Sequence, residues 1–190
     1  MYHFFAYLSK MKHIKRWGLM RNTEQENIKE HSFDVALIAH ALACISNVYF
    51  NGEFDPYRAM ALGMFHEAGE IITGDLPTPI KYYNPQIKEA YDEIEKLARA
   101  KILQMLPYEL QREYTSFFTQ GNSPEHTLVK AADKLCAYIK CVEELKSGNT
   151  EFEKARAKIA CEIAAYDDPA VVFFAKNFLP SFSLALDELN

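Results

Sequence analysis

Apolar residues recur every three to four positions along most of the chain, a period typical of amphipathic helices. A capping side chain followed by proline, which commonly starts a helix, occurs at Asp55-Pro56, Asn84-Pro85 and Ser123-Pro124. We therefore expect helices at about residues 4–15, 30–50, 56–74, 85–106, 107–118, 125–148, 151–166 and 169–177. No segment has a convincing strand pattern, so the sequence predicts an all-α fold, a single compact helical bundle forming one domain over 1–190.

Composition and charge limit the class of protein. Of the 190 residues, 49% are hydrophobic and 25% are charged, which excludes a disordered or low-complexity chain. The net charge of −5 argues against a nucleic-acid polymer as partner. The four cysteines form no CxxC pair and suggest reduced core thiols. No apolar run approaches the roughly 18 residues of a membrane span, and the N-terminal segment does not resemble a signal peptide. We expect a cytoplasmic protein with no membrane partner.

The predicted helix at 56–74 carries a histidine and two carboxylates in an otherwise apolar segment, MALGMFHEAGEII. His66 and Glu70 are four residues apart and would share one helix face, with Glu67 about 100° away. Burying these groups without partners is unfavourable, so something must neutralise them. In isolation, HExxE is equally consistent with surface carboxylates beside a core histidine. It also lacks the second histidine of the zinc-peptidase motif HExxH, which makes that enzyme class a distant alternative.

Two more polar residues stand on predicted apolar helices. His31 begins the helix at 30–50, where a lone histidine is commonly a core or capping residue. Asp133 lies in VKAADKLCAYIK, where the simplest interpretation is a salt bridge to Lys130 or Lys134. Taken with His66 and its carboxylates, they make a mixed nitrogen and oxygen ligand set suited to a divalent transition metal. Periodicity alone does not bring these helices together.

Long segments of the chain resemble a known family. They are HFFAYLSKMKHIKRWGLMRN, ENIKEHSFDVALIAHALA, GDLPTPIKYYN, LVKAADKLCAYIKCVEEL and FLPSFSLALDEL. In this order and spacing they are similar to the HD-domain phosphohydrolases, and within them to the bacterial 5′-deoxynucleotidases of YfbR type, over nearly the whole chain. The resemblance implies a homodimeric helical bundle that hydrolyses deoxyribonucleoside 5′-monophosphates with a divalent ion. Co²⁺ or Mn²⁺ is expected first, with Zn²⁺ or Mg²⁺ as alternatives.

The resemblance also implies which residues form the site. The implied metal ligands are His31, His66, Glu67 and Asp133. The implied catalytic residues are Glu70 and Arg16. The implied substrate contacts are Arg16, Trp17, His31, Asp75, Leu76, Pro77, Thr78 and Asp133.

The residue types suit these roles, although each has a structural alternative. Arg16 offers a planar fork for a phosphate. Trp17, otherwise a core anchor, would exclude a 2′-hydroxyl if its face packs against the sugar. Glu70 would accept a proton from water, pass one to the leaving 5′ oxygen, or orient His66.

The GDLPTP loop is restrained by two prolines. Pro77 and Pro79 fix their own φ angles and restrict Leu76 and Thr78 to extended conformations. The loop would thereby hold Asp75 against the sugar hydroxyl, as the resemblance implies. The residues alone equally suit a tight connection between helices with Asp75 as a cap.

One position departs from the family signature, which has aspartate where this chain has Glu67. The extra methylene moves the carboxylate by roughly 1.5 Å, whereas metal–oxygen distances hold within about 0.2 Å. Glutamate can still ligate through another rotamer or bidentately. Two alternative functions therefore remain: a related enzyme acting on another nucleotide, and a weakened nucleotide- or metal-binding module. A self-association surface or core packing would explain the apolar residues Phe173, Phe174, Phe178 and Phe182.

Overall fold

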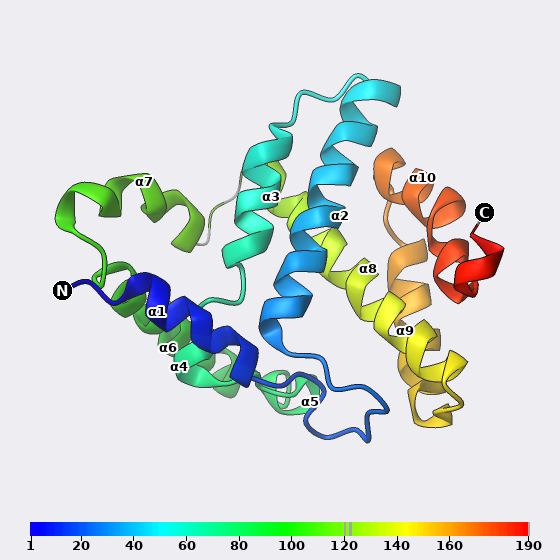
Figure 1. The fold of residues 1–190 in the computed structure, drawn as a ribbon, viewed down its shortest axis with the longest axis horizontal. Coiled ribbons are helices and arrows are strands. Elements are labelled where there is room, and N and C mark those ends of the chain that lie inside the picture. The colour runs from blue at the N-terminus through cyan, green and yellow to red at the C-terminus, as the bar shows by residue number, and fades with distance from the viewer. Residues whose placement is uncertain (120, 122, 190) are drawn as a thin grey trace. The chain divides into compact units, whose positions relative to one another are not determined.

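The computed structural model describes residues 1–119, 121 and 123–189, and it confirms an all-α fold (Figure 1). The α-helices are α1 (Phe4–Leu8), α2 (Ile28–Tyr49), α3 (Pro56–Phe65), α4 (Glu70–Thr73), α5 (Thr78–Lys81), α6 (Pro85–Leu103), α7 (Tyr108–Phe118), α8 (Pro124–Lys146), α9 (Glu153–Ala164) and α10 (Pro169–Asn177). Short 3₁₀ helices cover Ser9–His13, Thr150–Phe152, Leu179–Ser183 and Leu186–Glu188. Within the described residues, β pairing is limited to one isolated bridge between Lys15 and Asn27.

The described residues form two compact units. The first contains residues 1–21, 25–33 and the described part of 64–121. The second contains residues 22–24, 34–63 and the described part of 122–190. The chain passes from one unit to the other within α2 and again near the end of α3. The sequence-based expectation of one domain over 1–190 stays a prediction.

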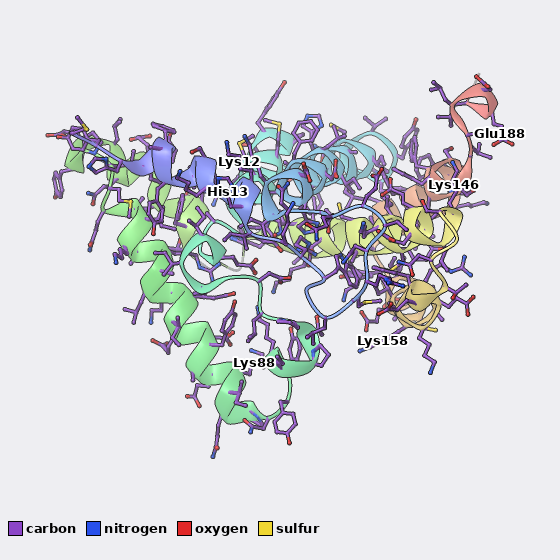
Figure 2. All side chains as sticks on the ribbon, turned by 60° about the horizontal axis from the view of Figure 1, so that its bottom comes forward. Lys12, His13, Lys88, Lys146, Lys158 and Glu188 are labelled. Carbon is purple, nitrogen blue, oxygen red and sulfur yellow. The ribbon has the colours of Figure 1, made fainter. Side chains whose placement is uncertain are left out.

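An aromatic core holds the first unit together. Phe4 of α1 and Phe118 of α7 are buried, with ring centroids 5.6 Å apart. Phe65, at the end of α3, packs 5.4 Å from Phe118. Burying each large apolar side chain contributes about 1.5–3 kcal/mol. This core therefore fixes the chain immediately before His66. The N-terminal part of α6, residues 85–90, is exposed, and Lys88 there pairs with Asp92 at 2.6 Å (Figure 2).

The second unit is built on the apolar face of α2, as the sequence stripe predicts. Val35 and Leu42 are fully buried, and Ile38 and Ile45 are nearly so. Helix α3 packs directly on the backbone of α2, because a Cβ at Gly63 would lie 2.7 Å from Cα of Ala36.

Two of the three predicted helix starts have the expected side-chain caps. Asp55 accepts hydrogen bonds from the backbone N–H groups of Tyr57 and Arg58, at 3.0 and 3.1 Å. Asn84 accepts one from Ile87 at 2.8 Å. Ser123 precedes α8 without a side-chain cap, so proline alone marks that start.

The helix predicted at 56–74 is interrupted. Helix α3 ends at Phe65, residues 66–69 form turns, and α4 begins at Glu70. The prediction that His66 and Glu70 share one helix face is therefore wrong. Bonds between residues three apart replace the helical pattern, since Glu70 N–H donates to Glu67 O at 2.9 Å. The turn also lies close to α6, because a Cβ at Gly69 would be 3.2 Å from a side-chain carbon of Arg99.

The structure also differs from the sequence prediction in two short segments and in the exposure of one cysteine. The helix predicted at 4–15 becomes 3₁₀ after Leu8. Thr78 begins α5, although the proline after it predicts an extended conformation. Pro79 falls in the first turn of that helix, where the missing N–H breaks no intrahelical bond. Cys161 is exposed and is not a core thiol.

The expectation that no apolar run approaches the length of a membrane span is wrong for α2. It is long and apolar enough to cross a membrane, with a mean hydropathy of 1.4 over the qualifying window. Half of that window is buried inside the protein, and a core helix meets the same criterion. The cytoplasmic location stays a prediction.

Candidate active site

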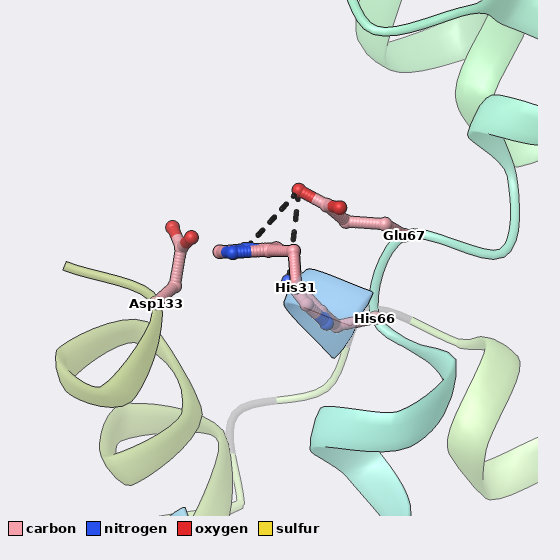
Figure 3. A group of neighbouring side chains, drawn as sticks. All are labelled: His31, His66, Glu67 and Asp133. Carbon is pink, nitrogen blue, oxygen red and sulfur yellow. Dashed lines mark ion pairs between the residues drawn. The ribbon is translucent and has the colours of Figure 1, made fainter. Parts of the chain in front are cut away.

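Three predicted metal ligands meet within the first unit. His31 lies in the first turns of α2 and is fully buried, while His66 and Glu67 lie in the turn after α3. Oε1 of Glu67 is 3.6 Å from Nε2 of His31 and 3.7 Å from Nε2 of His66 (Figure 3). The ring centroids of the two histidines are 5.3 Å apart. The interruption of the helix thus presents His66 and Glu67 together towards His31.

The donor atoms of this group suit a divalent ion. One donor atom from each of the three residues lies within 4.8 Å of the others. The second carboxylate oxygen of Glu67, Oε2, is buried and accepts no hydrogen bond from the described residues. A buried carboxylate oxygen without a partner is unfavourable, and a cation would satisfy it. Two imidazoles with a carboxylate are ligands that Zn²⁺, Co²⁺ and Mn²⁺ accept. The residues therefore fit a metal ion.

Arg16 lies beside this group and is held on both sides by carboxylates. Its Nη1 donates to Oε1 of Glu67, and its Nε donates to Oε2 of Glu26 at 3.0 Å. The side chain of Arg16 is 12% exposed, which keeps its charge in a poorly solvated place next to the histidines. A phosphate bound there would meet a preoriented guanidinium.

Glu26 is a site residue that the sequence analysis missed. Its Oε2 also accepts from Nε1 of Trp17 at 3.1 Å, and its Oε1 lies 3.6 Å from Nδ1 of His31. Burial would raise the pKa of Glu26, but its close contact with His31 and the charge of Arg16 lower the pKa below its usual value. The residue lies in the polar stretch 21–29, which has no periodicity to mark one buried carboxylate.

Trp17 has an uncommon backbone conformation. Its φ angle is +59°, in the left-handed region that bulky residues rarely adopt. Such a conformation costs about 1–3 kcal/mol and persists only when surrounding contacts hold it. Flanking hydrogen bonds do so: Arg16 N–H donates to Glu26 O at 3.1 Å, and Ile28 N–H donates to Ile14 O at 3.0 Å. The chain is therefore closed into a loop with the indole turned to Glu26.

Glu70 has a strongly perturbed carboxyl group. It is 8% exposed, and its Oε2 is buried without a hydrogen bond from the described residues. Burial, followed by the charges of Glu67 and Asp75, raises the pKa of Glu70 to about 9. A raised pKa favours the acid form of Glu70, which can donate a proton.

The predicted loop residues lie in the same unit and follow α4. Gly74 has a φ angle of +74°, which turns the chain sharply after the helix, and its carbonyl accepts from the hydroxyl of Tyr91 at 3.0 Å. Asp75 accepts a hydrogen bond from the backbone of Trp17, while burial raises the pKa of Asp75. The loop and the segment carrying Trp17 are thereby joined. Beyond Asp75, Leu76 and Pro77 are half-buried and Thr78 is exposed.

Asp133 belongs to the second unit and lies on α8, where it is half-buried. The ion pair of the neighbouring Lys134 is with Glu162, at 2.6 Å.

Comparisons with known proteins identify the family. A family model described as 5′-deoxynucleotidase YfbR-like matches residues 3–182. The chain belongs to the YfbR-like 5′-deoxynucleotidase family. A relative named 5′-deoxynucleotidase, from Yersinia pestis (strain Pestoides F), is 50% identical over 192 positions, covering 100% of this YfbR-like chain and 98% of the relative.

Solved structures agree with the fold of this YfbR-like chain. An HD-domain phosphohydrolase from Listeria innocua has a TM-score of 0.83 at 22% identity, covering 95% of this chain and 88% of that one. A cyanophage S-2L HD phosphohydrolase, bound to dA and one catalytic Zn²⁺, has a TM-score of 0.64 at 18% identity, covering 93% and 96%. The predicted helical fold of HD-domain type is thus confirmed, and membership of the 5′-deoxynucleotidase family makes the protein a phosphohydrolase.

Proposed function

We propose that this YfbR-like protein hydrolyses deoxyribonucleoside 5′-monophosphates to deoxynucleosides and phosphate at the site around His31, His66 and Glu67. The observation that carries the proposal is the Glu67 carboxylate, which faces both histidines and Arg16 at once. A cation site directly beside a buried guanidinium suits a phosphate group that must bind both. The family and the 5′-deoxynucleotidase relatives point to the same reaction.

The proposed metal ligands are His31, His66, Glu67 and Asp133. Two imidazoles and two carboxylates are a donor set that suits one divalent ion. A divalent ion bound there would lower the pKa of water and offset charge on the phosphate. The cyanophage neighbour with its catalytic Zn²⁺ supports a divalent ion. For this chain we propose Co²⁺ or Mn²⁺ first, with Zn²⁺ and Mg²⁺ as alternatives.

Glu70 and Arg16 are the proposed catalytic residues. Glu70, whose pKa is raised by burial and by the neighbouring carboxylates, is suited to give a proton to the leaving 5′ oxygen. Arg16 would hold the phosphate through the edge of its guanidinium that faces Glu67. Glu70 would thus act on the leaving group, and Arg16 would stabilise the charge on the phosphoryl group.

The sugar is proposed to lie between Trp17 and the loop after α4. The hydrogen bond from the Trp17 backbone to Asp75 brings the indole segment and the loop together. Asp75 would accept from a sugar hydroxyl, and Leu76, Pro77 and Thr78 would line the nucleoside with His31 and Asp133. An indole face against C2′ would leave no room for a ribose hydroxyl, which favours deoxyribose.

Removing proposed ligands tests the site. We expect His31→Ala and Asp133→Ala each to lose bound Co²⁺, measured by elemental analysis after dialysis, together with phosphate release from dAMP. The exposed residues His13 and Asp167 provide matched controls, His13→Ala and Asp167→Ala, that should keep both properties. Wild-type metal content and activity in the first pair would remove those residues from the ligand set.

The proposed assembly is a homodimer without nucleic-acid or membrane partners. Phe178 and Phe182 are 45% and 37% exposed and are available for self-association, whereas Phe174 is buried and belongs to the core. Light scattering after size exclusion measures the mass directly, and a monomer would contradict the proposal.

A further inference from the structure

One carboxylate in the first unit touches three proposed functional residues and has no assigned role. Oε2 of Glu26 accepts from Nε of Arg16 at 3.0 Å and from Nε1 of Trp17 at 3.1 Å. Its Oε1 lies 3.6 Å from Nδ1 of His31. We propose that Glu26 is a positioning residue, which holds Arg16, Trp17 and His31 in the geometry that binds the phosphate, the sugar and the metal ion. This inference rests on the proposed function of those three residues.

The hydrogen bond between Glu26 and Arg16 determines which edge of the guanidinium group faces the site. Glu26 engages Nε, and Nη1 engages Glu67 on the side of the two histidines. A guanidinium is planar, so fixing Nε fixes the plane and direction of the remaining N–H groups. Its side chain would otherwise lose considerable rotamer entropy when a phosphate binds. Glu26 therefore preorganises the phosphate contact.

The bond to Trp17 fixes the rotation of the indole ring. The positive φ angle sets where the side chain leaves the backbone, and the bond from Nε1 to Glu26 sets the far edge of the ring. A ring held at two points keeps its face in one plane. Discrimination against a ribose hydroxyl requires such a fixed wall, because a mobile one would yield to the additional oxygen.

The contact with His31 sets which ring nitrogen is presented to the ion. Glu26 lies beside Nδ1, while Nε2 faces Glu67 at 3.6 Å. A carboxylate at one nitrogen of a histidine orients the ring and favours the tautomer in which the other nitrogen ligates. The side chain of Glu26 is 13% exposed, so the interaction is little screened by water.

Closing the loop does not require this side chain. The backbone bonds of Arg16 with Glu26, and of Ile28 with Ile14, already join the two ends of the loop. The Glu26 carboxylate is therefore mostly buried although the backbone alone would hold the loop closed. Its three contacts with proposed functional residues explain why a carboxylate stands at this position.

The test compares Glu26→Gln and Glu26→Asp with Glu24→Gln, an exposed glutamate two residues earlier that takes part in none of these three contacts. The first readout is calorimetric titration with Co²⁺ alone. The second is emission and acrylamide quenching of Trp17, the single tryptophan of the chain. The third is kcat and KM for dAMP and AMP in the presence of Co²⁺. Thermal melts followed by circular dichroism verify folding.

We expect Glu26→Gln to raise the Kd for Co²⁺ by about 10- to 100-fold. Trp17 emission should shift to longer wavelength with easier quenching. The preference for dAMP over AMP should fall, mainly through a higher KM for dAMP. Glu26→Asp keeps the charge and should recover part of the Co²⁺ affinity, and Glu24→Gln should match the wild type in every readout.

Wild-type Co²⁺ affinity, Trp17 emission and nucleotide preference in Glu26→Gln would overturn the proposal. A lower kcat with unchanged Co²⁺ affinity and emission would also overturn it, because Glu26 would then act other than by positioning. If Glu26→Gln does not fold, the same comparison is made with Glu26→Asp. A wild type that hydrolyses neither nucleotide with any ion contradicts the proposed function, while the Co²⁺ and fluorescence readouts still decide the role of Glu26.

Discussion

At the scale of single residues, Glu67 is where this chain departs from the HD signature. Its carboxylate nevertheless faces both histidines and also reaches Arg16. The extra methylene is thus accommodated in the described structure, and the longer side chain gains a contact with the guanidinium. This geometry supports the proposal that glutamate serves as a metal ligand here.

Two substitutions of Glu67 separate length from charge. Glu67→Asp keeps the charge and should change kcat/KM for dAMP by no more than about threefold, within the modest energy of an adjusted contact. Glu67→Gln removes the charge and should lower Co²⁺ affinity by about tenfold or more. Calorimetry with Co²⁺ and steady-state kinetics measure both. A gain of about tenfold or more in Glu67→Asp would show instead that glutamate limits catalysis.

Trp17 is the residue proposed to distinguish deoxyribose from ribose, and its removal tests this role. In Trp17→Ala the wall beside the sugar is lost, so the dAMP to AMP ratio of kcat/KM should fall by about tenfold, the lower end for a steric discrimination. Parallel kinetics with both nucleotides measure the ratio. An unchanged ratio would remove Trp17 from this role.

The residues of the site differ in how visible they are in the sequence. His31, His66 and Glu67 stand out because they interrupt apolar runs, and the structure brings them together. Glu26 does not stand out, because its neighbours are polar and its burial comes from contacts ten positions away in Arg16 and nine in Trp17. Tertiary contacts of this kind leave no local signal.

At the scale of elements, the positions of the prolines and the spacing of the apolar residues predicted most helices with their approximate limits. They missed the end of α3 at Phe65, since His66 to Glu70 continue a helical period while the backbone forms turns. Close packing of Gly69 on Arg99 of α6 accompanies this break, and such packing is a tertiary feature. The break presents Glu67 to His31, so the unpredicted part of the fold is the part that forms the site.

The contact between α2 and α3 depends on a residue without a side chain. In Gly63→Ala the new Cβ would lie 2.7 Å from Cα and 2.9 Å from N of Ala36, both backbone atoms that cannot rotate away. We expect a loss of about 1–3 kcal/mol in the free energy of unfolding, typical of overpacking. Urea denaturation measures it. Gly18→Ala is the control, because nothing lies within 4 Å of its Cβ, and equal stability of both variants would contradict the packing argument.

Helix α8 contributes a pH-dependent stabilisation through Glu144. Burial would raise the pKa of this carboxyl, but hydrogen bonds from Lys140, Thr23 and Asn149 lower it to about 2. The ionised form is therefore favoured in the folded state. This contribution is complete above the unfolded pKa of about 4.5 and is lost as pH falls towards 2.

Removing the charge should reveal this dependence. Glu144→Gln leaves Lys140 with a buried ammonium, so it should lower the free energy of unfolding at pH 7 by about 3 kcal/mol or more. The difference from wild type should shrink between pH 4.5 and 2. Urea denaturation at pH 7 and pH 3 compares the two proteins. A difference independent of pH would contradict the assignment.

At the scale of the whole molecule, the family match over residues 3–182 covers both compact units. Most proposed site residues lie in the first unit, and Asp133 alone comes from the second. Periodicity predicted the helices, but it carries no information on how distant segments meet. The resemblance to the family supplied that part of the prediction.

The most direct test of the account is phosphate release from dAMP and AMP in parallel, by protein stripped of metal and then supplied with Co²⁺, Mn²⁺, Mg²⁺ or Zn²⁺. We predict no release before an ion is added, and faster release from dAMP than from AMP afterwards, with Co²⁺ or Mn²⁺ most effective. Release from folded protein that persists without any ion, or that proceeds equally from both nucleotides, would contradict it.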